Sequence, residues 1–188
     1  MKPQVAIISV SIREGRRSHR VALYFKNYLA EHLLADTEII DLRSYNFPLF
    51  TDTLKAQKDP STFALEFGVQ VNTAEAIIIV TPEYNGGMPA SLKNAIDLLN
   101  DEWRNKPIGI CTVSAGALGG SQVLMSLQFS LWKIGATIIA STYSVAKVQE
   151  AFSETGVPTD AIAADAYAKI FLTDLLDSIQ SHHHAIAE

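Results

Sequence analysis

The segment SVSIREGRRSHRVA, residues 9 to 22, places serines and arginines between an aliphatic run and a helical pattern. Ser11 and Ser18 carry hydroxyl donors, Arg13 carries a positive charge, and the first N–H groups of a helix point toward any bound anion. These residues are suited to a phosphate group. A helix capped by Ser18, with its arginines in solvent, accounts for the same pattern. The segment alone leaves both interpretations open.

A second segment, TPEYNGGMPASLKNAID, covers residues 81 to 97. Pro82 ends an aliphatic run, and Gly86 and Gly87 permit backbone conformations that other residues avoid. Exposed peptide groups and the ring of Tyr84 could contact a flat heteroaromatic ligand with alternating donors and acceptors. An ordinary tight turn is the alternative interpretation.

A third segment, SAGALGGSQVLMSLQ, covers residues 114 to 128 and consists of small residues that lead into a helical pattern. Small side chains allow a planar ligand to approach the backbone, and nearby N–H groups stabilise negative charge on it. A helix that needs glycine to pack closely on a sheet would show the same composition.

Short aliphatic runs alternate with amphipathic stretches along the chain. The runs predict strands buried on both faces; they cover residues 4–10, 37–42, 75–81, 107–113 and 136–142. The amphipathic stretches predict helices; they cover residues 16–34, 60–73, 88–100, 119–135 and 158 to about 184. Pro89 and Gly135 are helix start and stop signals. The alternation predicts one domain, residues 1–188, with a parallel sheet between two layers of helices.

Parallel sheets of this kind bind ligands at the carboxyl ends of their strands. The three ligand-suited segments follow the first, third and fourth aliphatic runs, so all three are expected at that edge. The longest irregular stretch, residues 43–59, either has a function or packs its apolar residues over the sheet edge.

The composition excludes several classes of protein. Fifteen basic and 20 acidic residues give a net charge of −5, which argues against a nucleic-acid-binding surface. The only cysteine, Cys111, lies in an aliphatic run and is expected to be a buried hydrophobic residue. We find no signal peptide and no run of about 18 apolar residues, so we expect a cytoplasmic protein with no membrane partner.

The second segment resembles the hallmark of a known family. Pro82-Glu83-Tyr84-Asn85-Gly86, followed by Pro89 and Leu92-Lys93-Asn94-Ala95, is similar to a motif of the NADPH-dependent FMN reductase family. That family comprises flavodoxin-like oxidoreductases, including quinone, azo-dye and chromate reductases. Ser11-x-Arg13 and Ser114-Ala115-Gly116 occur in the expected order, and the resemblance covers about residues 4 to 145.

The resemblance implies a flavodoxin-like three-layer α/β sandwich with a five-stranded parallel sheet of order 2-1-3-4-5. It also implies a bound FMN, whose phosphate would contact Ser11, Arg13 and Ser18. Because Glu14 to Arg17 lengthen this loop relative to many members, Arg16, Arg17 or His19 are alternative phosphate ligands.

The same resemblance assigns the remaining cofactor contacts. Pro82, Glu83, Tyr84, Asn85 and Gly86 would contact the isoalloxazine edge and the ribityl chain. The other side of the ring would be lined by Ser114, Ala115, Gly116 and Gly119.

The implied reaction is a two-electron transfer. NADPH or NADH would deliver a hydride to flavin N5 and leave, and a small acceptor would take the electrons from the same face. The acceptor could be a quinone, an azo compound, free flavin or a chromate-like oxidant. We assign no catalytic side chain, because the flavin carries the chemistry. The alternatives are a flavodoxin-type electron carrier and a phosphate-recognising regulatory domain without a redox role.

Two further expectations concern assembly and metals. In the family, helices corresponding to residues 88–100 and 119–135 form a dimer interface, so a homodimer or homotetramer is expected. His182, His183 and His184 project about 100° apart on a helix and do not converge on one ion, so no metal site is expected there.

Overall fold

The computed structural model describes residues 2–187, with side chains up to His182. Its centre is a five-stranded sheet, all parallel, in the predicted order β2-β1-β3-β4-β5. The strands are β1 (Gln4–Ser9), β2 (Asp36–Asp41), β3 (Ala76–Pro82), β4 (Pro107–Val113) and β5 (Thr137–Val145). The flavodoxin-like fold expected from the resemblance is therefore confirmed.

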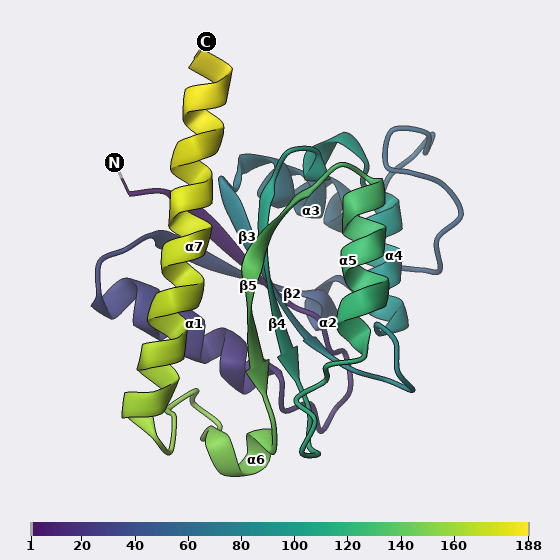
Figure 1. Ribbon diagram of the computed structural model, residues 1–188. Helices are drawn as coiled ribbons and strands as arrows, with labels where there is room; N and C mark the ends of the chain where they lie inside the picture. The colour runs from purple at the N-terminus through teal and green to yellow at the C-terminus, as the bar shows by residue number, and fades with distance from the viewer. Residues whose placement is uncertain (1, 188) are drawn as a thin grey trace.

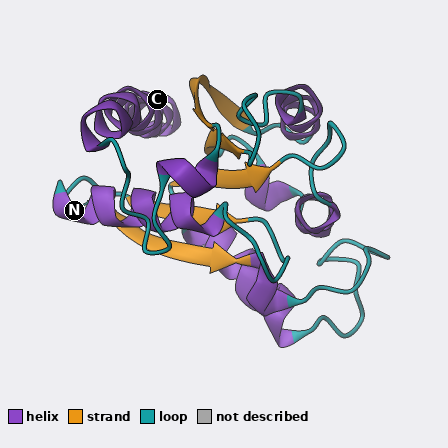
Figure 2. Cartoon of the chain, turned by 90° about the horizontal axis from the view of Figure 1, so that it is seen from below, coloured by secondary structure: helices purple, strands orange, loops and turns teal. Residues whose placement is uncertain are grey.

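Helices cover both faces of the sheet (Figure 1; Figure 2). On one face lie α1 (His19–Glu31), α6 (Val148–Ala151) and α7 (Ala161–Ala187). The other face is covered by α2 (Leu42–Tyr45), α3 (Thr62–Thr73), α4 (Ala90–Leu98), the 3₁₀ helix η1 (Asp101–Trp103) and α5 (Val123–Lys133). The sandwich has the three layers that alternating strands and helices require.

The two residues predicted to start and stop helices, Pro89 and Gly135, lie at helix ends. Pro89 stands at the N-cap of α4, and Gly135 follows α5 with a φ of +83°, a left-handed conformation that favours glycine. The apolar residues of 43–59 pack against the protein only in part: Tyr45 is buried, whereas Leu49 is 83% exposed. The side chains of His183 and His184 lie outside the described residues.

The expectation that all five strands are buried on both faces is wrong for the edge strands. β1, β3 and β4 are almost completely buried, because each has a strand on either side and helices above and below. β2 and β5 have one neighbouring strand each, and along both of them more exposed positions alternate with less exposed ones. Aliphatic content alone does not distinguish a central strand from an edge strand.

The outer strand β5 is irregular. Ile108 of β4 pairs with Ile138, but Ile110 pairs with Thr142, so β5 carries a bulge between these pairs. Beside the bulge, the backbone N–H and the hydroxyl of Ser141 both donate to Asp174 of α7, at 2.9 and 2.8 Å.

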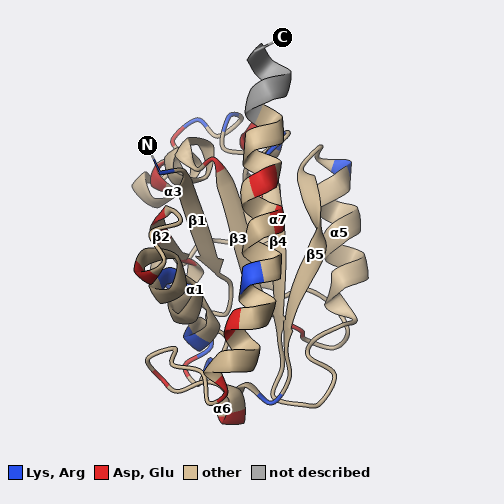
Figure 3. Cartoon of the chain, turned by 60° about the vertical axis from the view of Figure 1, so that its left-hand side comes forward, with Lys and Arg blue, Asp and Glu red and all other residues tan. Residues whose placement is uncertain are grey.

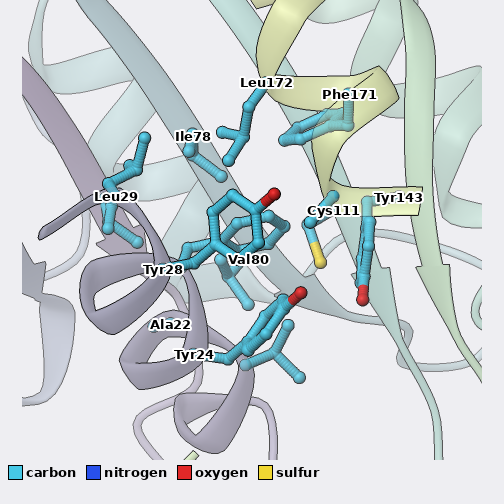
Figure 4. Packing of buried hydrophobic residues seen from close by; sticks show 14 of the residues in the cluster. Ala22, Tyr24, Tyr28, Leu29, Ile78, Val80, Cys111, Tyr143, Phe171 and Leu172 are labelled. Atoms are coloured by element: carbon cyan, nitrogen blue, oxygen red, sulfur yellow. The ribbon is translucent and has the colours of Figure 1, made fainter. Parts of the chain in front are cut away.

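The core between the sheet, α1 and α7 is rich in aromatic rings (Figure 4). Phe25 packs against Tyr143 and Phe171 at centroid distances of 5.0 and 5.4 Å. Cys111 is fully buried in this cluster, as predicted, and burial raises the pKa of its thiol well above the ordinary value. This core holds the sheet rigidly, so the loops at its carboxyl edge have a fixed platform.

No helix in the described part of the chain has the length and apolar character needed to cross a membrane.

Candidate functional site

A cleft of about 470 Å³ lies at the carboxyl edge of the sheet, toward which the arrowheads of β4 and β5 point in Figure 1. Its walls come from the loops after β1, β3 and β4 and from the start of α6. It is lined by Ser11, Arg13, Gly15, Arg17, Ser18, Pro82, Glu83, Tyr84, Val113, Ser114, Ala115, Gly116 and Val148. The structure therefore brings together residues from all three segments that the sequence singled out.

Most of the predicted cofactor-binding residues line this cleft, but four do not: His19, Asn85, Gly86 and Gly119. Three lining residues were not assigned as cofactor contacts: Gly15, Val113 and Val148. Arg17, named above only as an alternative phosphate ligand, also lines the cleft. Val148 follows the fifth strand, and the carboxyl-edge rule, applied there as well, would have identified it.

Ser18 closes the cleft at the start of α1. Its side chain is buried, with 3% exposure, and among the described residues its Oγ has no hydrogen-bond partner. Ser18 stands at the N-cap position of α1, as predicted, but its side chain makes no cap hydrogen bond and its backbone is already helical (φ −60°, ψ −28°). A capping side chain normally requires an extended backbone at this position. The hydroxyl is thus available to an oxygen atom bound in the cleft.

The three arginines of the first loop have different partners. Arg16 forms a two-point ion pair with Asp41 and donates to the carbonyl of Ser11 at 3.0 Å. Arg13 lies over the ring of Tyr84, with 5.8 Å from Cζ to the ring centroid, and Arg17 donates to Gln149 at 3.3 Å. Arg13 and Arg17 line the cleft, whereas Arg16 does not.

The second loop is built around a two-residue turn. Tyr84 and Gly87 exchange backbone hydrogen bonds of 3.0 and 3.1 Å, and the residues between them, Asn85 and Gly86, have φ values of +53° and +77°. This is the mirror-image turn that Asn-Gly favours. The turn places Asn85 and Gly86 beyond the cleft and holds Tyr84 inside it, where its hydroxyl lies 2.8 Å from Ser11 Oγ.

Glu83 connects the second and third loops. Its carboxylate accepts the backbone N–H groups of Gln122 and Val123 at 2.9 and 3.3 Å, so it caps the start of α5 from a distant part of the chain. A carboxylate at this end of a helix is stabilised by the helix dipole. Glu83 lines the cleft and at the same time fixes the helix that follows the third loop.

The third loop is held by hydrogen bonds to the backbone carbonyl of Gly116. Ser114 donates its hydroxyl to the carbonyl of Gly116 at 2.8 Å, and the N–H of Lys147 donates to the same carbonyl at 3.0 Å. A Cβ at Gly116 would meet no atom within 4 Å, so this position faces open space in the cleft. Gly119, with a φ of +62°, accepts a hydrogen bond from Thr112 at 2.7 Å and shapes the loop from outside the cleft.

His19 lies behind the first loop. Its Nδ1 is 2.9 Å from Ser9 Oγ and 4.0 Å from an oxygen of Asp41. Burial and the neighbouring charge of Arg16 hold the pKa of His19 below its ordinary value, although Asp41 opposes this shift. Burial by itself would raise the pKa of Asp41, but hydrogen bonds from Arg16 and from the Arg43 backbone hold it below the ordinary value.

The cleft combines two kinds of surface. Its first part offers the free hydroxyl of Ser18 and the cationic side chains of Arg13 and Arg17, which fit a phosphate. Its second part offers the ring of Tyr84 and the open space at Gly116, which fit a flat ring system. The residues present therefore fit a planar cofactor that carries a phosphate.

Comparisons with known proteins agree with this geometry. A model of the family described as NADPH-dependent FMN reductase matches residues 3–150. An NAD(P)H-dependent FMN reductase of Saccharomyces cerevisiae is 35% identical over 149 residues, which cover 72% of this chain and 77% of the yeast protein. A quinone reductase of Pseudomonas putida is 34% identical over 122 residues, which cover 62% of each chain.

The fold also matches solved structures. The flavoenzyme NAD(P)H:(acceptor) oxidoreductase of Paracoccus denitrificans superimposes with a TM-score of 0.79 over 96% of this chain and 98% of that one, at 24% sequence identity.

Proposed function

Because this chain belongs to the NADPH-dependent FMN reductase family, we propose that it transfers two electrons from NAD(P)H through FMN, bound in the carboxyl-edge cleft, to a small acceptor. It is an NAD(P)H-dependent enzyme of the FMN reductase and quinone reductase type, with FMN as its prosthetic group. The acceptor that we propose is a quinone, an azo compound, free flavin or a chromate-like oxidant. Relatives named quinone reductase and NADPH azoreductase support the first two of these.

One observation supports this use of the cleft above all others. Ser18 Oγ is buried and has no partner among the described residues, although Arg13 and Arg17 line the same cleft. A buried hydroxyl without a partner costs about 1–3 kcal/mol. An FMN phosphate oxygen would accept this hydrogen bond and remove that cost.

Each wall of the cleft has a proposed role. Ser11, Arg13, Arg17 and Ser18 hold the phosphate, and Tyr84 stays in place through its contact with Ser11. Pro82, Glu83, Ser114, Ala115 and Gly116 position the flavin ring between the second and third loops. When bound, FMN supplies the redox chemistry by accepting a hydride from NAD(P)H and delivering two electrons to the acceptor. No side chain of the cleft is assigned a proton-transfer step.

The visible spectrum of the purified protein and NADPH oxidation in the presence of a quinone test the proposal. We expect a flavin spectrum and steady oxidation of NADPH. A reductive titration separates the enzyme from a flavodoxin-type carrier, since a carrier accumulates the one-electron form and oxidises NADPH poorly. A colourless protein that fails to bind added FMN would refute the proposal and favour a phosphate-recognising domain.

Arg13→Ala tests the phosphate site directly. Loss of one charge-assisted contact is expected to weaken FMN binding by about 1.5–3 kcal/mol, roughly 10- to 100-fold. Arg104→Ala is the matched control, because Arg104 is also exposed but lies away from the cleft, before β4. Full FMN occupancy of Arg13→Ala after dialysis would contradict the phosphate assignment.

We also propose that the enzyme forms a homodimer through α5. Met125, Phe129 and Trp132 are 80%, 64% and 65% exposed, and the rings of Phe129 and Trp132 lie 5.8 Å apart. Figure 3 shows that α5 carries no charged residue before its last one, Lys133. An exposed apolar face of this kind is typical of an association surface.

The mass in solution tests this assembly. Light scattering is expected to give twice the chain mass for the wild type and the single chain mass for Trp132→Glu. Tyr167→Glu is the control, because Tyr167 is 68% exposed but lies on α7. A monomeric wild type would refute the dimer. A cytoplasmic location, where NAD(P)H is plentiful, completes the proposal, and cell fractionation tests it.

A further inference from the structure

We propose that Ser9, Arg16, His19 and Asp41 form a brace that fixes the phosphate-binding loop and keeps Arg16 out of the cleft. Arg16 and Asp41 are thus positioning residues, which act on the cofactor through Ser11 and the shape of the loop. The inference rests on the proposed binding of FMN in the cleft.

Both ends of the loop converge on Asp41. β1 and β2 pair so that Ser9, the last residue of β1, stands beside Asp41, the last residue of β2. His19, the first residue of α1, contacts Ser9 Oγ at 2.9 Å and approaches Asp41 to 4.0 Å. The loop from residue 10 to residue 18 therefore begins and ends beside Asp41.

Arg16 closes the middle of the loop. Its Nη1 donates both to Asp41 and to the carbonyl of Ser11, the latter at 3.0 Å, while Nη2 donates to the second oxygen of Asp41. The side chains of Arg16 and Asp41 are only 12% and 20% exposed, so solvent and salt screen the pair less than a surface pair. Ser11 lines the cleft, so the guanidinium holds a cleft residue from behind.

Asp41 is itself well anchored. Besides the two contacts from Arg16, it accepts the backbone N–H of Arg43 at 3.1 Å and caps the short helix α2. The carboxylate therefore links the loop to the end of the sheet through side-chain and backbone contacts together.

The brace also sets the charge of the cleft. In the part of the chain that the structure describes, neither Arg13 nor Arg17 has an ion-pair partner, whereas the charge of Arg16 is matched by Asp41. The loop thus presents two of its arginines to the ligand and uses the third for its own structure.

Asp41→Asn distinguishes this role from direct phosphate binding, because the two roles predict opposite changes in FMN affinity. If Arg16 braces the loop, losing its partner loosens Ser11 and weakens FMN binding about tenfold, which corresponds to about 1.4 kcal/mol. If Arg16 instead binds phosphate, losing Asp41 frees its charge and strengthens FMN binding. Asn still caps α2, so the helix is preserved.

The measurement is a fluorescence titration of the apo protein with FMN and, separately, with riboflavin, which lacks the phosphate. We expect Asp41→Asn and Arg16→Gln to weaken FMN binding equally, the double variant to lose no more than either, and riboflavin affinity to fall much less than FMN affinity. Asp101→Asn, which breaks the exposed ion pair with Lys55, is the matched control and is expected to change neither affinity.

Other results would overturn the brace. Tighter FMN binding by Asp41→Asn, additive losses in the double variant, or an equal loss of riboflavin affinity would each do so. If Asp41→Asn fails to fold, Arg16→Lys provides the comparison, because lysine keeps the charge but loses the planar two-point contact. Failure of the wild type to bind FMN or riboflavin would refute the proposed function, whereas unchanged FMN affinity in every variant would refute only the brace.

Discussion

The hydroxyl of Ser18 is buried and has no hydrogen-bond partner among the described residues. Removing it is therefore expected to have different effects on protein stability and on FMN binding. Ser18→Ala removes the unpaired group, so the apo protein is expected to keep its stability or gain about 1 kcal/mol. FMN binding is expected to weaken roughly tenfold, because one hydrogen bond to the phosphate is lost. Thermal unfolding of the apo protein and FMN titration measure the two effects.

Ser61→Ala is the control for this prediction. Ser61 caps α3 by accepting the N–H of Ala64 at 3.1 Å, so its loss is expected to destabilise the protein by about 1 kcal/mol without changing FMN affinity. An apo protein that is clearly destabilised by Ser18→Ala would show that Ser18 has a structural hydrogen bond after all.

The pKa of His19 makes the stability of the apo protein depend on pH. Burial and Arg16 hold this pKa below 6.5, the ordinary value, so the folded state disfavours the protonated ring. The unfolded chain therefore binds a proton first as the pH falls, and the stability contributed by neutral His19 is present above about pH 6.5 and lost below it. Asp41, with its pKa also held low, loses its contribution only at more acidic pH.

Urea unfolding of the apo protein across about pH 5 to about pH 8 measures this dependence. His19→Asn is expected to flatten the change just below the ordinary histidine value and to leave the acidic part unchanged. The His182→Asn variant, on α7, serves as the control. An identical pH profile for His19→Asn and the wild type would contradict the assignment.

At the scale of the elements, Glu83 joins one loop to the helix that follows another. Glu83→Gln keeps the side-chain length but removes the negative charge at the start of α5, which is expected to cost about 0.3–1 kcal/mol. Hydrogen exchange is expected to quicken at the amides of Gln122 and Val123, which donate to Glu83. Glu102→Gln, which alters an exposed contact in η1, is the control. Unchanged protection of both amides would argue against the cap.

Two glycines, Gly109 within β4 and Gly116 in the loop that follows it, allow the effect of a mutation on core packing to be distinguished from its effect on FMN binding. A Cβ at Gly109 would lie 2.5 Å from Phe171 Cζ, whereas at Gly116 it would meet nothing within 4 Å. Gly109→Ala is therefore expected to destabilise the protein by about 1–3 kcal/mol. Gly116→Ala is expected to keep the stability and to weaken FMN binding, because its methyl group enters the cleft. Denaturant midpoints and FMN titration of the two variants distinguish these outcomes, and equal midpoints would contradict the packing argument.

The sequence predicted the order of the elements because the aliphatic period and the helix signals are local. The convergence of three segments followed from the rule that parallel strands end at one edge, and the structure places Ser11, Tyr84 and Gly116 in one cleft accordingly. Other features depend on pairs that are distant in sequence. Arg16 finds Asp41 only because β1 and β2 are neighbours in register, and Glu83 reaches Gln122 only after the loops have folded. No local pattern identifies such partners.

At the scale of the whole molecule, the proposed cofactor cleft and the proposed association surface lie on different parts of the protein. The cleft opens at the carboxyl edge of the sheet, and the apolar residues Met125, Phe129 and Trp132 lie on α5 along one side. Glu83 belongs to the cleft and caps the helix that carries those residues. The proposed dimer would form through α5, and Glu83 of the cleft fixes the start of this helix. Dimerisation and FMN binding are therefore expected to stabilise each other. Thermal unfolding with and without FMN, compared between the wild type and Trp132→Glu, measures this coupling.

The bulge in β5 and the contact between Ser141 and Asp174 bear on whether the edge of the sheet can pair with a strand of another molecule. An exposed edge strand offers unpaired backbone groups to the strands of other molecules and is a common starting point for aggregation. Here the bulge interrupts the regular ladder, and Asp174 occupies the N–H of Ser141 with a charged side chain. Strand-to-strand growth between copies of the sheet is therefore expected to be hindered at this point, in keeping with the proposed dimer, whose contact is between helices.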